Sequence, residues 1–126
     1  MAKAIGLGGI FFKSRDPAAL SAWYAKHLGL RLEDWGGVRF DEDTARPGFT
    51  LWAPFAAHTD YFAPSTQPYM INFRVDDLDA LLAQLRAADV VVDERIESSE
   101  LGRFGWLMDP EGTRIELWQP PAQVGG

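Results

Sequence analysis

The chain has 126 residues, a length that fits one compact domain. Hydrophobic residues make up 47% and charged residues 24% of it, a globular composition that argues against disorder. The formal net charge is −6 and no basic run is present, which excludes nucleic acid as a partner. There is no cysteine, so disulfides, thiolate metal ligands and Cys nucleophiles are excluded. No apolar run of about 18 residues occurs, and we expect a cytoplasmic protein without a membrane partner.

The first half predicts a strand, a helix and three further strands. Residues 9–15 are typical of a strand, and Asp16-Pro17 predicts the start of a helix, with Asp as N-cap and Pro at the first helical position. Gly29 is a natural helix stop. Further strands are predicted over 30–33, 38–40 and 49–52. One apolar stripe on the helix comprises Leu20, Trp23, Tyr24, His27 and Leu28.

The second half repeats this pattern after a connector over residues 53–68, which holds three prolines and has no period. A strand is predicted over 69–75, and Asp77 caps a helix that places four leucines on one face. Strands follow over 90–93, 104–108 and 113–119, with a turn at 109–112. Asp89 stands where a helix stop is usually Gly, and it can adopt the left-handed cap.

The two halves also match residue by residue. Phe12-Lys13 corresponds to Phe73-Arg74, 61 residues later, and the segment 49–54 is echoed 66 residues later by 115–120. These matches predict a single domain over 1–126, built from two tandem βαβββ modules over about 5–54 and 69–121.

A tandem βαβββ pair that closes with Asp-Pro-Glu-Gly-Thr-Arg-Ile-Glu-Leu-Trp over 109–118 resembles the vicinal oxygen chelate superfamily. That superfamily includes glyoxalase I, the bleomycin-resistance proteins and the extradiol dioxygenases. The resemblance extends from Gly9 to Pro120. It implies an α+β fold in which both modules form one curved, partly open mixed sheet with helices on its outer face.

In metal-dependent members, the first and last strands of each module supply ligands for one metal ion that polarises a chelated substrate. Carried onto this chain, the four ligand positions fall on Gly9, Thr50, Met70 and Glu116. Only Glu116 offers an anionic ligand, whereas a catalytic divalent ion generally needs about three protein ligands. We therefore expect no metal cofactor.

Two histidines leave an alternative open, in which one of them replaces a missing ligand. His27 lies on the apolar helical stripe, where a packed core-edge histidine is the simpler interpretation. His58 lies in the connector, where a surface histidine is the simpler one.

Strand alternation separates a uniformly apolar face, to be covered by helices, from a mixed face that suits a small-molecule pocket. The apolar set comprises Ile10, Phe12, Phe49, Leu51, Ile71, Phe73, Val75, Ile115 and Leu117. On the mixed face we assign Glu116 as a catalytic base or hydrogen-bond partner, the alternative being an ion pair with Arg74 or Arg114. Trp52, Trp106 and Trp118 form a candidate aromatic clamp, with core packing as the alternative. The predicted ligand-binding residues are Phe11, Thr50, Trp52, Met70, Asn72, Arg74, Trp106, Arg114 and Trp118.

These features predict a protein of the bleomycin-resistance kind that binds a small planar or aromatic molecule without the usual metal. The acidic balance favours a cationic guest, while Lys13, Arg74 and Arg114 also allow an anionic one. The alternative is a metal-dependent glyoxalase- or dioxygenase-type enzyme, a lyase or isomerase with Glu116 as ligand or base; a metal-free enzyme using Glu116 as base is a third possibility. Small members of the superfamily usually pair, and an open sheet leaves edges to cover, so we expect a homodimer.

Overall fold

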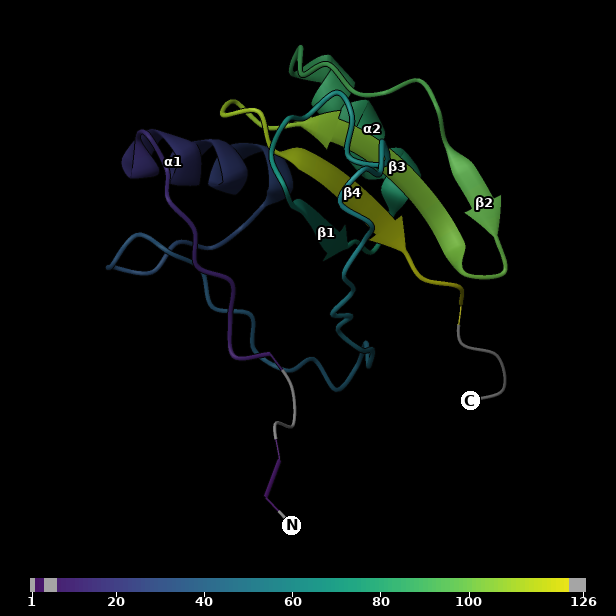
Figure 1. Cartoon of the computed structure of the whole chain (residues 1–126), viewed down its shortest axis with the longest axis horizontal. Coiled ribbons are helices and arrows are strands. Elements are labelled where there is room, and N and C mark those ends of the chain that lie inside the picture. Colours follow the sequence, from purple (N-terminus) through teal and green to yellow (C-terminus); the bar gives the residue numbers. More distant parts are fainter. Residues whose placement is uncertain (1, 4–6, 123–126) are drawn as a thin grey trace.

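A four-stranded mixed sheet and two helices form the ordered centre of the molecule, which has the predicted α+β class (Figure 1). The structure is a computed structural model and describes residues 2–3 and 7–122, so residues 5 and 6 of the predicted first module lie outside it. The elements in chain order are α1 (Pro17–Leu28), β1 (Met70–Arg74), α2 (Leu78–Ala87), β2 (Glu97–Ser99), β3 (Gly102–Met108) and β4 (Arg114–Gln119). Within the described part of the chain, no helix is long and apolar enough to cross a membrane.

The strands follow the order β1-β4-β3-β2. β1 runs parallel to β4, whereas β3 is antiparallel to both β4 and β2. The predicted turn at 109–112 joins β3 to β4: Gly112 has φ +84°, and its N–H donates to the carbonyl of Asp109 at 3.1 Å. This register sets Asn72, Glu116 and Trp106 side by side across three strands.

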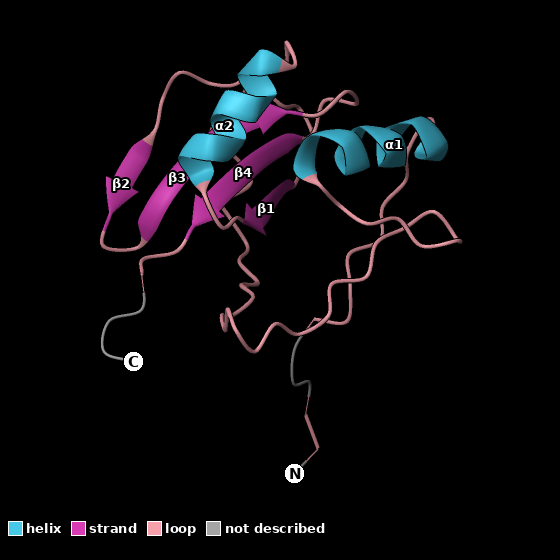
Figure 2. Ribbon diagram, turned by 180° about the vertical axis from the view of Figure 1, so that it is seen from behind, coloured by secondary structure: helices cyan, strands magenta, loops and turns pink. Residues whose placement is uncertain are grey.

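Both helices begin and end where the sequence predicts. The side chain of Asp16 accepts the N–H of Ala19 at 3.1 Å, and Asp77 does the same for Ala80. Gly29 ends α1 with φ +72°, and Asp89 takes φ +60° just after α2, as expected for a left-handed cap. The two helices lie on the same face of the sheet (Figure 2).

The hydrophobic core lies between the helices and that face of the sheet. Leu78, Leu82 and Leu85 of α2 are buried there with Leu20 and Tyr24 of α1. The predicted apolar face of the second module is confirmed: Ile71, Ile115 and Leu117 are buried, and Phe73 and Val75 pack against the core. Burial of such side chains supplies most of the stability of a small domain.

The first module forms its helix but not its predicted strands. Segments 9–15, 30–33, 38–40 and 49–52 hold no strand; a single bridge pairs Leu32 with Val38, supported by the Glu33 N–H on the carbonyl of Gly37 at 2.8 Å. An isolated hairpin of a few residues is marginally stable without a third strand beside it. These segments pair with no strand of the four-stranded sheet, so their alternating pattern alone does not hold them in strands.

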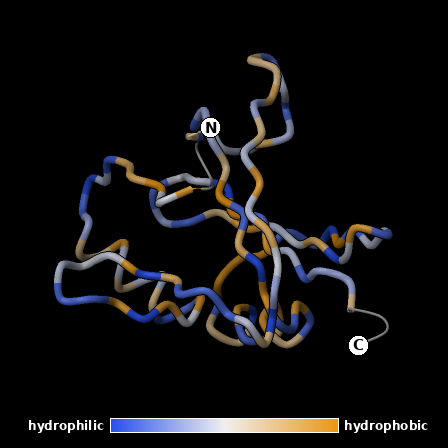
Figure 3. Tube along the Cα trace, turned by 90° about the horizontal axis from the view of Figure 1, so that it is seen from below, coloured by the Kyte–Doolittle hydropathy of each residue, from blue (hydrophilic) through white to orange (hydrophobic). Residues whose placement is uncertain are grey.

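The hydrophobic residues of these segments are consequently exposed, which corrects the prediction that helices cover them. The residues that this prediction named in the first module are 46–71% exposed: Ile10, Phe12, Phe49 and Leu51. Phe11 and Trp52, which were predicted to bind the ligand, are 92% and 79% exposed. The segments leave the sheet on the β1 side (Figures 1 and 2). Figure 3 shows hydrophobic stretches both in the centre of the molecule and on parts of the chain that extend from it. They enclose, together with β1, an open cavity of about 2450 Å³.

Two smaller differences concern the second module. The strand predicted over 90–93 is reduced to a bridge between Val92 and Leu107. Beside it, the N–H of Asp93 donates a hydrogen bond to the carbonyl of Trp106. The strand β2 was not predicted, because Glu97-Ser98-Ser99 has neither alternation nor strand-forming side chains.

Candidate functional site

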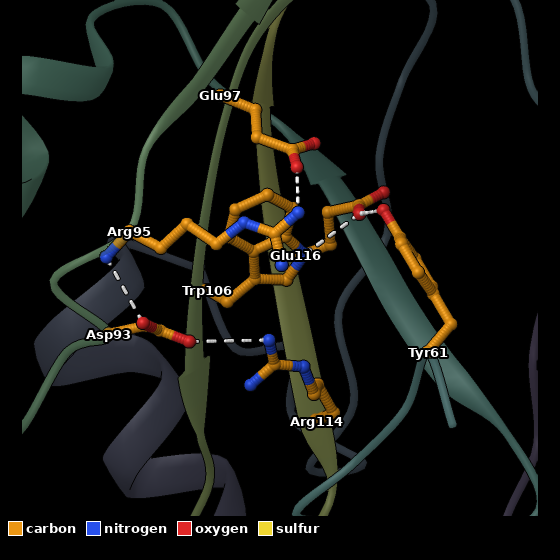
Figure 4. A network of polar contacts seen from close by, with 7 residues as sticks. All are labelled: Tyr61, Asp93, Arg95, Glu97, Trp106, Arg114 and Glu116. Atoms are coloured by element: carbon orange, nitrogen blue, oxygen red, sulfur yellow. Dashed lines mark hydrogen bonds and ion pairs between the residues drawn. The ribbon is translucent and has the colours of Figure 1, made fainter.

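Glu116 lies at the centre of β4 on the face opposite the helices, and its side chain is the focus of a polar network (Figure 4). The residue is only 7% exposed. Oε1 accepts the amide N–H of Asn72 at 2.8 Å, while Oε2 accepts the indole N–H of Trp106 at 2.8 Å. Oε2 also accepts the hydroxyl of Tyr61 at 2.5 Å. Three neutral donors therefore hold a buried carboxylate, which offers about four acceptor positions in all.

Tyr61 reaches this carboxylate from the connector, 55 residues away in sequence, and sequence reasoning missed it. Its ring stacks on Phe55 of the same connector, with 5.6 Å between centroids and an interplanar angle of 22°. Burial, and then the hydrogen bond to Glu116, raise the pKa of Tyr61 well above the ordinary value for a tyrosine. The length of the connector was the one sequence signal that pointed here, because no periodicity marks this tyrosine.

An aromatic wall flanks Glu116, formed by Phe104, Trp106 and Trp118. Phe104 stacks between the two tryptophans in parallel fashion, 6.5 Å from the ring of Trp106 and 6.3 Å from that of Trp118. Phe104 and Trp118 are cross-strand partners, whereas Phe104 and Trp106 are two residues apart on one face of β3. The indole N–H of Trp118 donates to the carbonyl of Leu101 at 2.7 Å, which fixes the ring. Both tryptophans are buried, so their rings are held rigidly beside the carboxylate, and the half-buried Phe104 is the most accessible ring of the three.

Two arginines adjoin Trp106. The guanidinium carbons of Arg95 and Arg114 lie 5.4 and 5.8 Å from the centroid of its ring. Arg114 is buried and pairs with Asp93 at 3.4 Å, while its Nε has no hydrogen-bond partner within the described residues. Arg95 pairs with Glu97. Each of the two arginines thus forms an ion pair with a carboxylate other than Glu116.

The alternative in which Glu116 forms an ion pair with Arg74 or Arg114 is wrong. Within residues 2–3 and 7–122, the ion pairs join Arg39 to Asp41, Arg95 to Glu97, Arg103 to Asp79 and Arg114 to Asp93. The carboxylate of Glu116 is held by hydrogen bonds from uncharged groups instead.

The structure brings together the predicted site residues of the second module and separates those of the first. Register places on one face Met70, Asn72, Arg74, Trp106, Arg114, Glu116 and Trp118. Phe11, Thr50 and Trp52 lie exposed in the extended segments, outside any strand. Trp52 therefore does not join Trp106 and Trp118 in a clamp; Phe49 contacts Trp118 instead, at 5.5 Å between centroids.

The residues present do not fit a divalent metal ion. In the described part of the chain, no three His, Cys, Asp or Glu side chains are grouped closely enough to hold one. His27 packs its ring 5.1 Å from Trp23 on α1, and His58 is exposed on the connector. Of the four ligand positions implied by the resemblance, Glu116 is held by neutral donors and Thr50 is exposed. The absence of a metal cofactor stays a prediction.

One solved structure supports this fold, and two others are reported beside it as similar chains. A glyoxalase/dioxygenase from Nostoc punctiforme superposes with a TM-score of 0.55 at 16% identity, covering 96% of this chain and 99% of that one. An antibiotic binding protein from a Streptomyces species, TnmS3, gives a TM-score of 0.48 at 26% identity, covering 81% and 84% of the two chains. A lactoylglutathione lyase from Agrobacterium tumefaciens gives 0.44 at 16% identity and the same coverage.

Sequence comparison identifies the family. Among proteins of curated function none matches the chain. The model of the glyoxalase-like domain matches residues 9–118, almost the whole range over which the sequence resembles the vicinal oxygen chelate superfamily. The resemblance is thereby confirmed, and the chain belongs to the glyoxalase-like domain family.

Proposed function

We propose that the protein binds a small planar aromatic molecule on the sheet face that carries Glu116, without a metal ion. The observation that carries this proposal is a buried carboxylate, held by neutral donors, beside a wall of three parallel rings. An apolar wall supplies contact area, and a fixed polar group gives orientation, which are the two requirements of a small-molecule site.

The polar groups at this face also limit the charge of the guest. Glu116 keeps one acceptor position on Oε1, next to the amide of Asn72. Arg114 contributes an Nε–H that has no acceptor in the part of the chain described. Because the cations Arg95 and Arg114 already pair with acids, they do not favour an anionic guest. A neutral aromatic molecule with one donor and one acceptor matches these groups.

An enzyme that uses Glu116 as a base is the alternative, and the geometry favours it less. A base must reach a substrate proton at hydrogen-bond distance. Three of about four acceptor positions of Glu116 are filled by the protein itself, so a base at this position would have to take up a proton while three donors already share its charge. Binding of a ligand donor needs only the acceptor position that remains on Oε1.

Tryptophan fluorescence tests the proposal, because a guest packed on the accessible ring of Phe104 would lie close to both Trp106 and Trp118. A panel of two- and three-ring aromatic molecules is titrated into the protein, and saturable quenching is expected for at least some of them. Glu116→Gln should weaken binding about tenfold, because a hydrogen bond to a charged group is about twice as strong as a neutral one. Glu42→Gln, which changes an exposed carboxylate of the first module, is the matched control. Saturable binding that is identical in all three proteins would refute a role for Glu116.

We also propose that the protein acts as a homodimer. The exposed aromatic residues around 11–12 and 49–52, and the free outer edge of β1, would be covered in a pair. Sedimentation velocity at micromolar concentration should give the mass of two chains, and a monomer there would refute the proposal.

A further inference from the structure

The group that Tyr61 presents to Glu116 is itself a phenol. Its hydroxyl donates to Oε2 at 2.5 Å while its ring stacks on Phe55. A hydroxylated aromatic ring therefore already sits on the carboxylate, and it belongs to the chain.

The three donors to Glu116 differ in how firmly the fold holds them. Asn72 is on β1 and Trp106 on β3, both paired to β4 along their length. Tyr61 is on the connector, which has neither helix nor strand over 53–68, and the residue is 37% exposed. Trp106 in contrast is fully buried. Of the three donors, Tyr61 can leave without breaking a strand pair.

We infer that the site selects planar aromatic molecules that carry a hydroxyl group, and that the ligand's O–H replaces that of Tyr61 on Oε2 of Glu116. The inference rests on the proposed function and narrows its ligand class. A hydroxylated ligand restores the hydrogen bond that the departing tyrosine gives up, so the buried carboxylate keeps three donors. An analogue without the O–H would leave that acceptor position empty, which sites built around a hydrogen-bonding group tolerate poorly.

Paired probes test the selectivity on the unmodified protein. 2-Naphthol and its methyl ether share the same two rings and differ in the hydroxyl hydrogen. Isothermal titration calorimetry should show naphthol binding at least about tenfold more tightly than the ether. In Glu116→Gln this preference should be lost or greatly reduced, because the charged acceptor is gone.

Removing the hydroxyl of Tyr61 tests whether the ligand's hydroxyl takes its place on Glu116. In Tyr61→Phe the ring and its stacking on Phe55 are kept but the hydroxyl is absent, so 2-naphthol should bind about fivefold more tightly than to the unmodified protein. Tyr69→Phe is the matched control, because the hydroxyl of Tyr69 makes no contact with Glu116 and lies 3.4 Å from Oγ1 of Thr113. Its affinity should be unchanged.

The visible absorption of a bound phenol tests whether the ligand's hydroxyl contacts the carboxylate of Glu116. 4-Nitrophenol is partly ionised near neutral pH, and its phenolate absorbs in the visible. Next to the carboxylate of Glu116 the bound probe should stay protonated, so the phenolate absorption should fall on binding. In Glu116→Gln it should not.

The outcomes separate this inference from the proposed function. Equal affinity for naphthol and its ether would overturn the hydroxyl preference and leave aromatic binding intact. Weaker naphthol binding by Tyr61→Phe would show that Tyr61 helps to hold the ligand, and would overturn the exchange. Failure of all aromatic probes to bind would refute the proposed function itself.

Discussion

The hydrogen bond from Tyr24 to Asp109 ties helix α1 to the second half of the chain, and its loss should be measurable. The hydroxyl donates to Oδ2 at 2.8 Å between two buried residues. Oδ1 of the same carboxylate accepts the N–H groups of Glu111 and Thr113 at 2.8 and 2.9 Å. Tyr24→Phe keeps the buried ring and creates no cavity beyond the hydroxyl, so the change isolates one hydrogen bond to a charged group.

Such a bond contributes about 1.5–3 kcal/mol, and the buried Oδ2 left behind has no other side-chain donor among the described residues. For a chain of 126 residues, a loss of about 2 kcal/mol should lower Tm by about 7 °C. Urea unfolding followed by circular dichroism should show a lower midpoint with an unchanged slope. Tyr69→Phe, which loses a contact of 3.4 Å to Thr113, should change stability by less than about 1 kcal/mol. If the two variants are equally stable, the bond between α1 and the 109–112 turn does not stabilise the fold in the way described.

Three further predictions concern pH, packing and metal. Burial raises the pKa of Tyr24 far above its ordinary value, so above about pH 10 the folded state keeps the proton while the unfolded chain loses it. The urea midpoint of unfolding should therefore fall as the pH rises above about 10, and it should fall less in Tyr24→Phe. Leu82→Ala should lower the free energy of unfolding by about 2–5 kcal/mol because the side chain is fully buried, whereas Val91→Ala, at an exposed position, should stay within about 0.5 kcal/mol in the same urea titration. Zinc, nickel, manganese or iron(II) should leave Tm unchanged in a thermal-shift series, since no three His, Cys, Asp or Glu side chains of the described residues are grouped so that they could hold an ion. Near-stoichiometric metal in the purified protein would contradict this.

The second module could be predicted from sequence because its signals are local and agree with one another. Asp77 caps a helix, four leucines follow at helical spacing, and the turn at 109–112 sets the register of the last two strands. Alternation along β4 then places Glu116 and Trp118 on one face and Leu117 on the other, as the structure shows.

In the first module, local sequence signals did not predict which segments form strands. Its segments alternate as strands do, yet a strand exists only when a neighbour supplies hydrogen bonds, and alternation does not say which neighbour. Phe11 and Trp52 were assigned to the site on alternation, and Thr50 on alternation and on the family resemblance, yet all three lie exposed. Tyr61 was missed for the opposite reason: it reaches Glu116 through the path of an irregular connector, which follows no period.

The contact between Tyr24 and Asp109 spans 85 residues, and this separation has a consequence during synthesis. The ribosome adds about 5–20 residues per second, so α1 emerges roughly 4–17 s before the turn that holds it. During that interval the helix has no sheet to pack against, because every strand of the described chain lies after it. The aromatic residues of the first half are exposed to solvent during the same interval. The nascent chain therefore depends on the strands between Met70 and Gln119 to become native, and a ribosome stalled ahead of β4 would expose a hydrophobic segment that chaperones recognise.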